Sequence, residues 1–364
     1  MNRLGWHWWP AHHDIPSEPV GSRPACQRRG VCMWGCPEGA KASTDITHWP
    51  QAIARGARLE TGARVTRVLV GPRLLATGVE YVDRDGIERR AEADVVVLAA
   101  NAVGTARLLL ASACAAFPDG LANASGLVGR RLMMHPFAVA TGVFEEQLET
   151  WRGNVGSRIQ CLQFYETDAA RGFVRGAKWS LAPSTGGPLN AALPARAGAA
   201  TWGPEHHARV RERFGHCLSW GIFGEDLPED ENRVTLDPSL VDAVGMPAPR
   251  IAYAASENSR RLLDFHVARA SESLREAGAR SVDTLTLMRG AGWHLLGTAR
   301  MGDDPATSVV DAWGRAHDVE NLLVVDGSVF VTAGGVNPTN TISALALRFA
   351  ERLLERRRLQ PVPT

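Results

Sequence analysis

The chain has 364 residues, of which 45% are hydrophobic and 22% charged, as expected of a soluble globular protein with room for two cores. Its 40 basic and 39 acidic residues give no net basic character, so composition offers no support for nucleic-acid binding. No apolar run is long enough for a transmembrane segment, and the start of the chain lacks the features of a signal peptide. We therefore expect a cytoplasmic protein by default, with a periplasmic or membrane-associated location possible only through a partner.

Residues 1–50 are rich in Pro, Gly, His and Cys without sustained periodicity, which predicts ordered loops. The segment contains a C-x5-C-x3-C-P pattern made by Cys26, Cys32, Cys36 and Pro37. Three thiols so close cannot all form disulfides without strain. The spacing suits an iron–sulfur cluster, a zinc ion with His48 or His12 as fourth ligand, or a loop of buried free thiols.

Residues 51–135 show the strand, turn and helix pattern of part of an α/β domain. The pattern predicts helices at 51–58 and 105–113 and strands at 63–70, 77–82, 87–91 and 95–100. Asp85-Gly86 is a two-residue hairpin signal between the second and third of these strands. The strand at 95–100 is a continuous apolar run, which is typical of a strand buried on both faces.

Residues 136–290 have a different pattern, in which Pro and Gly interrupt short alternating segments. A long amphipathic helix is expected at 256–278, with Gly278 as its stop. This region therefore reads as an α+β domain inserted between two pieces of the α/β domain.

Residues 291–364 place polar side chains on two loops. His294 is flanked by glycines, which we interpret as mobile. Further on, a strand at 321–326 ends on Asp326, and a loop rich in small residues leads to Asn337 and a helix at 341–356. A strand end, a Gly-rich loop and a helix N-terminus are typical of a polar ligand site.

Each of these residues also has a purely structural interpretation. His294 could be a buried, satisfied histidine, Asn337 a helix N-cap, and Asp326 a turn residue that closes a strand. His135 precedes a proline and could merely end an element. Cys114, Cys161 and Cys217 are isolated, which favours structural burial.

Five separated segments carry a resemblance to a known family. They are RPACQRRGVCMWGCPEGAKAS, VVVLAANAVGTARLLLAS, GLVGRRLMMHP, GWHLLGTARMGDDP and SVVDAWGRAHDVENLLVVDGSVFVTAGGVNPTNTISALA. The last two contain H-x-x-G-x-x-R-M-G, V-D-x-S and G-G-x-N-P-T. The chain thus resembles the glucose–methanol–choline (GMC) family of flavin oxidoreductases. Its cysteine segment resembles that of the dehydrogenase subunits that oxidise glucose, fructose or gluconate.

The resemblance implies roles for individual residues. His294 would be the base that takes the substrate hydroxyl proton while hydride leaves for flavin N5, and Asn337 would bind the same oxygen. The implied FAD contacts are Val65 at the adenine, Asp326 and Gly327 near the ribityl–pyrophosphate, and Asn337, Pro338 and Thr339 at the isoalloxazine. In some relatives a similar cysteine spacing binds a [3Fe-4S] cluster, which favours that ligand for Cys26, Cys32 and Cys36.

The implied fold is an FAD/NAD(P)-binding Rossmann-like α/β domain with an inserted α+β substrate domain built on an antiparallel sheet. Residues 51–135 and 291–364 would belong to the first domain and 136–290 to the second. The sequence contains no G-x-G-x-x-G, so we expect the FAD-binding domain to be incomplete at its N-terminus. The apolar residues 6–9 would then be interior sequence left exposed.

The expected function is oxidation of the CH–OH group of a sugar, polyol or sugar acid, with FAD as hydride acceptor. If electrons leave through a cluster to a carrier, the enzyme is a dehydrogenase rather than an oxidase. The expected partners are then a small subunit and a cytochrome-type acceptor. One alternative is an inactive fragment, or a misassigned start, of such an enzyme. Another is a non-enzymatic metal-binding or docking subunit.

Overall fold

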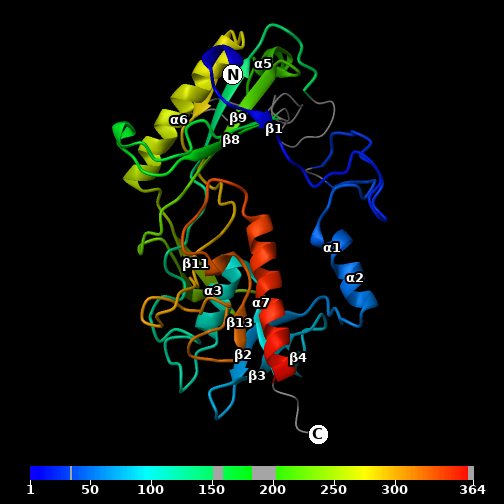
Figure 1. The fold of residues 1–364 in the computed structure, drawn as a ribbon, viewed down its shortest axis with the longest axis vertical. Helices are drawn as coiled ribbons and strands as arrows, with labels where there is room; N and C mark the ends of the chain where they lie inside the picture. Colours follow the sequence, from blue (N-terminus) through cyan, green and yellow to red (C-terminus); the bar gives the residue numbers. More distant parts are fainter. Residues whose placement is uncertain (33–34, 151–158, 183–201, 360–364) are drawn as a thin grey trace. The chain divides into compact units, whose positions relative to one another are not determined.

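A computed structural model describes residues 1–32, 35–150, 159–182 and 202–359, which form two compact units (Figure 1). Unit 1 comprises Met1–Leu59, Pro136–Gly224 and Glu257–Ala291, and unit 2 comprises Glu60–His135, Glu225–Ser256 and Gly292–Thr364. Among the helices described, none combines the length and the apolar character that crossing a bilayer requires.

Unit 1 is built on a six-stranded sheet in the order β1-β7-β8-β9-β6-β12, and every neighbouring pair is antiparallel. Its strands are β1 (Trp9–Pro10), β6 (Phe137–Val143), β7 (Ile159–Cys161), β8 (Ala177–Ala182), β9 (Cys217–Gly224) and β12 (Ser281–Leu285). Its helices are η1 (Asn2–Leu4), α1 (Thr44–Thr47), α2 (Trp49–Ala54), η2 (Ala169–Arg171), α5 (His206–Arg213) and α6 (Glu257–Glu276). The expected antiparallel sheet is confirmed.

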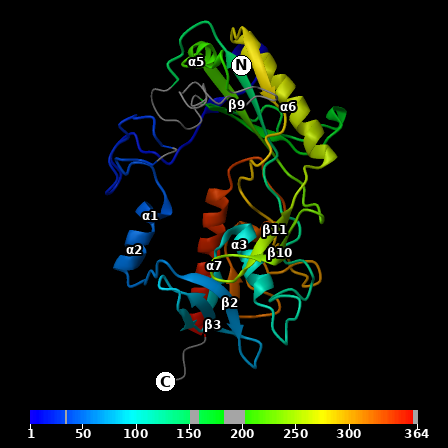
Figure 2. The ribbon, with the colours of Figure 1, turned by 180° about the vertical axis from the view of Figure 1, so that it is seen from behind.

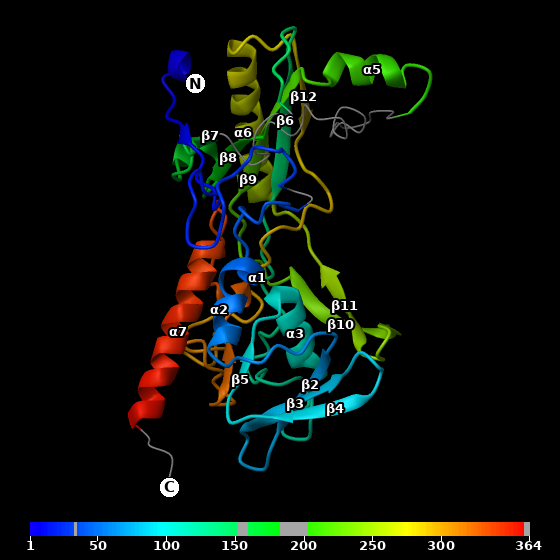
Figure 3. The ribbon, with the colours of Figure 1, turned by 90° about the vertical axis from the view of Figure 1, so that its right-hand side faces the viewer.

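Helix α6 packs against β6, β9 and β12 of this sheet (Figure 3). Its expected apolar face is confirmed, since Leu262, Leu263, Val267, Ala270 and Leu274 are all buried. They meet Trp179, Trp220 and Ile222 from the sheet in one core cluster. The helix ends two residues before Gly278, which adopts the left-handed conformation.

The aromatic start of the chain is exposed only in part: Trp8 is exposed as expected, whereas Trp6 and Trp9 are half-buried within unit 1. The Trp6 ring packs edge-on against Phe164 at 5.0 Å and against Trp179 at 6.1 Å between centroids. Trp9 pairs with Gln160 of β7 at the sheet edge. The first residues therefore complete the core of unit 1, and of the tryptophans among them only Trp8 is exposed.

Unit 2 contains an antiparallel three-stranded sheet, a hairpin, and a short parallel pair. These are β2 (Arg64–Val70), β3 (Ala76–Val82) and β4 (Glu88–Glu92), the hairpin β10 (Arg233–Val241) and β11 (Pro247–Ala252), and the pair β5 (Val96–Leu98) and β13 (Leu322–Val324). The helices are α3 (Asn101–Ala111), η4 (Gly327–Val329) and α7 (Thr339–Leu359). The β10–β11 hairpin packs against α3 (Figure 2), which explains why residues 225–256 belong to unit 2 rather than to the inserted domain expected at 136–290.

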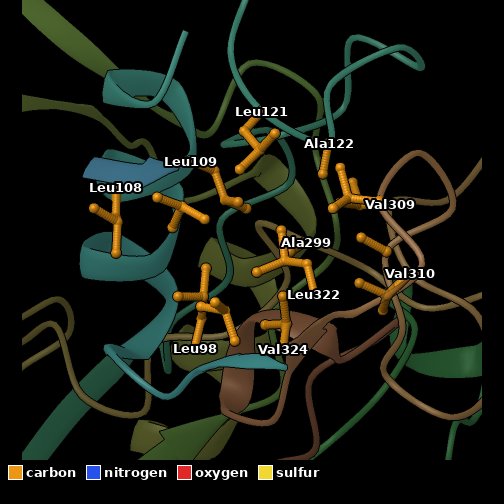
Figure 4. Packing of buried hydrophobic residues seen from close by; sticks show 14 of the residues in the cluster. Leu98, Leu108, Leu109, Leu121, Ala122, Ala299, Val309, Val310, Leu322 and Val324 are labelled. Carbon is orange, nitrogen blue, oxygen red and sulfur yellow. The ribbon is translucent and has the colours of Figure 1, made fainter. Parts of the chain in front are cut away.

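The core of unit 2 lies between α3 and the parallel pair (Figure 4). Leu98 and Leu109 pack there with Leu322 and Val324, all at most 5% exposed. The expectation that the β5 run is buried on both faces is wrong, because Val97 is 48% exposed. Alternate residues of a strand point to opposite faces, and the core covers only the face that carries Val96 and Leu98.

Candidate active site

His294 and Asn337 lie side by side in unit 2, although 43 residues separate them. The Asn337 side-chain nitrogen lies 3.4 Å from His294 Nε2. An amide nitrogen can only donate, so Nε2 is the acceptor in a hydrogen bond between these two atoms. Nδ1 is buried, whereas Asn337 is exposed. A basic nitrogen beside an amide donor can therefore meet a ligand hydroxyl from the exposed side.

The backbone explains this placement. His294 adopts a left-handed conformation with φ of 57°, which few residues other than glycine do. Helix α7 begins at Thr339, and the Pro338 carbonyl accepts the first helical hydrogen bond, from Ile342 at 2.9 Å. Asn337 therefore precedes the cap position, which Pro338 occupies. The interpretation of Asn337 as the N-cap is wrong by one residue.

His135 is a third member of the site that the sequence did not reveal. Its ring lies 4.7 Å from the His294 ring, at an interplanar angle of 81°, and the residue is only 2% exposed. Its position before Pro136 suggested the end of an element, and no local pattern pointed to His294. A histidine next to the MM pair of RRLMMHP was the only available signal.

Two of the three glycines around His294 are closely packed, whereas Gly290 has open space around it. A Cβ on Gly292 would lie 2.9 Å from the Met134 sulfur, and one on Gly297 would lie 2.2 Å from the Arg131 carbonyl oxygen. Gly297 also requires a φ of 97°. Both glycines let the segment 292–297 lie directly against the chain that leads to His135.

Asp326 organises the loop that follows β13. One carboxylate oxygen accepts the Thr105 hydroxyl at 2.5 Å, and the other accepts the Ser328 amide at 2.9 Å and its hydroxyl at 2.6 Å. Asp326 is 8% exposed and caps η4. The structure thus supports the interpretation of Asp326 as a turn residue that closes the strand.

Three further residues were expected to contact FAD. Pro338 and Thr339 are next to Asn337, and Thr339 is exposed at the start of α7. Val65 lies in β2, a different part of unit 2, where the ladder to β3 is irregular between Val65 and Arg67. The structure therefore groups Pro338 and Thr339 with His294, whereas Val65 belongs to a separate element.

Three free cysteines of unit 1 share one small cavity. Cys26, Cys32 and Cys36 are half-buried, and all line a cavity of about 20 Å³. The Cys36 sulfur accepts the Lys41 amide hydrogen at 3.5 Å, and this bond lowers the pKa of the thiol. In the stretches that the structure covers, no group of three or more His, Cys, Asp or Glu is arranged to hold a metal ion.

The zinc interpretation is not supported by the surroundings of these thiols. Neither His12 nor His48 is among the described residues lining the cavity. His48 Nδ1 instead lies 2.8 Å from the Thr47 hydroxyl. Among the described residues, the three thiols therefore line one cavity that no histidine enters.

Family models match two stretches of the chain. Models described as GMC oxidoreductase match residues 4–137 and 228–346. Together these stretches contain the cysteine segment, His135, His294 and Asn337. They therefore include the site described above and most of unit 2.

The chain is similar to several characterised proteins over nearly its whole length. It is 42% identical over 359 residues to the 2-methyl-1,2-propanediol dehydrogenase of Mycolicibacterium austroafricanum, covering 98% of this chain and 65% of that protein. It is 30% identical to the fructose dehydrogenase large subunit of Gluconobacter japonicus, covering 97% and 64%. Among solved structures, pyridoxine 4-oxidase from Mesorbium loti has a TM-score of 0.57 at 21% identity, covering 87% and 62%. The chain thus spans somewhat less than two thirds of these relatives.

Proposed function

Because the chain belongs to the GMC oxidoreductase family, we propose that it carries the catalytic part of an FAD-dependent dehydrogenase acting on the CH–OH group of a sugar, polyol or sugar acid. The observation that carries the proposal is the 3.4 Å approach of the Asn337 amide to His294 Nε2. A diol dehydrogenase and a fructose dehydrogenase subunit among the relatives support this substrate class.

In the proposed reaction, His294 and Asn337 both act on the substrate oxygen, each in a different way. His294 Nε2 accepts the hydroxyl proton as the C–H bond breaks, and Nδ1 keeps its own proton, so the ring becomes an imidazolium. The Asn337 amide donates a hydrogen bond to the same oxygen and offsets the negative charge that develops there. Asparagine does not titrate, so this hydrogen bond persists across the working pH range.

FAD, when bound, supplies the two-electron acceptor that takes the hydride from carbon. The residues present suit the isoalloxazine end of that cofactor. Thr339 is exposed at the N-terminus of a 21-residue helix, which favours the electron-rich pyrimidine edge of a flavin. Asn337 and Pro338 would complete that contact. The Val65 backbone at the β2 irregularity would meet the adenine, and the Asp326–Gly327 loop would approach the ribityl chain.

The sequence contains no G-x-G-x-x-G to hold the FAD pyrophosphate. We therefore propose that stable FAD binding needs a βαβ unit outside this sequence. The test is expression of the chain alone and with a separate polypeptide carrying such a unit, followed by an absorption spectrum. We expect a yellow complex only on co-expression. Flavin retained by the chain alone at equal occupancy would refute the need for the second unit.

We further propose that Cys26, Cys32 and Cys36 bind a [3Fe-4S] cluster that passes electrons to a cytochrome-type acceptor, with a small subunit as partner. The shared cavity and the N–H···S bonds at Cys26 and Cys36 support this assignment. Iron and sulfide analysis after anaerobic purification tests the assignment, with Cys32→Ser as the loss-of-cluster variant and Cys114→Ser as control.

Replacement of His294 by Ala or Gln tests the central role. In the flavin-loaded protein we expect turnover to fall about 10³-fold while the flavin spectrum is unchanged, because a general base contributes on the order of 10²–10⁴. A docking or metal-binding subunit would be indifferent to this change. Unaltered turnover in both variants would exclude His294 as the base. If an iron-free preparation formed one peroxide for each substrate molecule oxidised, the protein would be an oxidase rather than a dehydrogenase.

A further inference from the structure

The segment that ends at His135 pairs with the segment that carries His294. Met133 and Leu296 exchange both backbone hydrogen bonds, each 3.0 Å long, which defines an antiparallel bridge. Side chains two positions apart on a strand point to the same face of the ladder. The pair His135 and His294 lies two positions beyond the Met133–Leu296 bridge, so these two residues are opposite each other on one face. The His135 amide donates to the Trp293 carbonyl oxygen at 3.3 Å. In a regular ladder the His135 amide would donate to the carbonyl oxygen of residue 294. The left-handed backbone at His294 shifts this bond by one residue, to Trp293, and brings the rings of His135 and His294 together.

The other side of the His135 segment is also held. The buried Asp226 carboxylate accepts the Met134 amide at 3.2 Å and the Tyr253 hydroxyl at 2.8 Å. Burial and the neighbouring carboxylate raise the pKa of Tyr253, so its hydroxyl remains a donor. Two residues before Met134, the Leu132 amide donates to the Asn232 carbonyl oxygen at 2.8 Å. The chain that carries His135 is thus fixed on both edges.

We infer that His135 is a positioning residue whose buried ring packs edge to face against His294 and holds His294 Nε2 toward Asn337. The inference rests on the proposed role of His294 as base. Three observations support it: the ring geometry, the antiparallel bridge, and the clamp at Asp226. His135 is 2% exposed, so we place its effect on the reaction in the orientation of the neighbouring His294 ring.

The orientation of the His294 ring matters because Nε2, and not Nδ1, is the nitrogen that lies beside Asn337. Close packing at Gly292 and Gly297 supports the left-handed backbone of His294. A perpendicular ring at 4.7 Å opposes rotation of the imidazole about its own axis. Loss of that ring would let Nε2 and Nδ1 exchange positions, and a displacement of this kind lowers turnover without removing any catalytic group.

The experiment compares His135→Phe, which keeps a ring, with His135→Leu, which does not. In the flavin-loaded protein we expect kcat within about threefold of the wild type for His135→Phe and a loss of about 20-fold for His135→Leu, with KM changed less than twofold. In the chain alone, ¹⁵N-histidine NMR should show one His294 tautomer, protonated at Nδ1, for the wild type and His135→Phe, and averaged nitrogen shifts for His135→Leu. His135→Gln replaces the Leu variant if that variant does not fold.

Equal kcat losses in the Phe and Leu variants would overturn the inference, because ring packing would then not be the cause. A single unchanged His294 tautomer in His135→Leu, together with full activity, would overturn it as well. The NMR experiment needs neither flavin nor turnover. If His294→Ala remains active, the proposed function fails, whereas the tautomer comparison still decides whether His135 orients His294.

Discussion

The Leu295 carbonyl oxygen lies 2.7 Å from the point where a Cβ on Gly327 would be, so the loop after β13 touches the backbone next to His294. The Gly297 amide also donates to the Gly327 carbonyl oxygen at 3.1 Å. Gly327 is buried and shows no left-handed φ, so the absence of a side chain there serves this close approach. The glycine of the V-D-G-S motif is thereby in contact with the segment that carries His294.

Gly327→Ala should therefore destabilise unit 2 and displace His294. A methyl group 2.7 Å from a carbonyl oxygen forces the two segments apart, and overpacking of this kind costs about 1–3 kcal/mol. Urea unfolding and turnover are the measurements, and both should decline. Gly245→Asn is the control, since that glycine has open space and a left-handed φ of 78° that asparagine tolerates. Equal stability of the two variants would contradict the expectation.

Asn337→Ala should lower kcat about 100-fold with a small effect on KM, because the lost hydrogen bond matters most as charge develops on the substrate oxygen. Asn340→Ala is the matched control, an exposed asparagine in the first turn of α7. Steady-state kinetics of the flavin-loaded protein would check both variants. A KM effect with unchanged kcat would mean that Asn337 only binds the substrate.

Thr105→Val should destabilise unit 2 by about 1.5–3 kcal/mol, because it removes the donor to the buried carboxylate of Asp326. Thr105→Ser keeps the hydroxyl and is the control. Denaturant unfolding of both variants provides the comparison. If Thr105→Val is no more destabilising than Thr105→Ser, the 2.5 Å hydrogen bond contributes less to stability than expected.

His266 should make unit 1 sensitive to acid. It is fully buried among aromatic rings, and its Nδ1 accepts the Trp179 indole N–H at 2.9 Å. Burial lowers the pKa of His266 to about 3, from an ordinary value of 6.5. The unfolded chain therefore binds a proton between pH 6.5 and 3 that the folded chain does not. The stability contribution is present above pH 6.5 and is lost as the pH falls toward 3.

The measurement is the free energy of unfolding of unit 1 at pH 7 and at pH 5. One such group should account for a loss of about 2 kcal/mol over that interval, at 1.36 kcal/mol per pH unit below 6.5. His266→Gln keeps an acceptor for Trp179 without a titrating group, so its stability should change less with pH. His7→Gln, at an exposed position, should leave the wild-type slope intact. A slope unaffected by His266→Gln would assign the acid sensitivity elsewhere.

Regular elements were predictable because their signals are local. The apolar spacing of α6 and the Asp85-Gly86 turn between β3 and β4 identify structure from residues a few positions apart. The motif around His294 and Asn337 was equally visible in the sequence. Their proximity agrees with the catalytic pair that the family resemblance implies.

The features that escaped prediction depend on contacts between distant residues. His135 contacts His294 because Met133 and Leu296 form a backbone bridge, and the sequence around position 135 does not predict this contact. The glycines around His294 looked mobile because the atoms they approach, in Arg131 and Met134, lie about 160 positions earlier in the chain. The exposure of Val97 depends on which strands and helices surround β5, which its own apolar run does not specify.

His135, His294 and Asn337 all belong to unit 2, whereas the six-stranded sheet belongs wholly to unit 1. Substitutions in that sheet can therefore accumulate over evolution without changing the contacts that these three side chains make with one another.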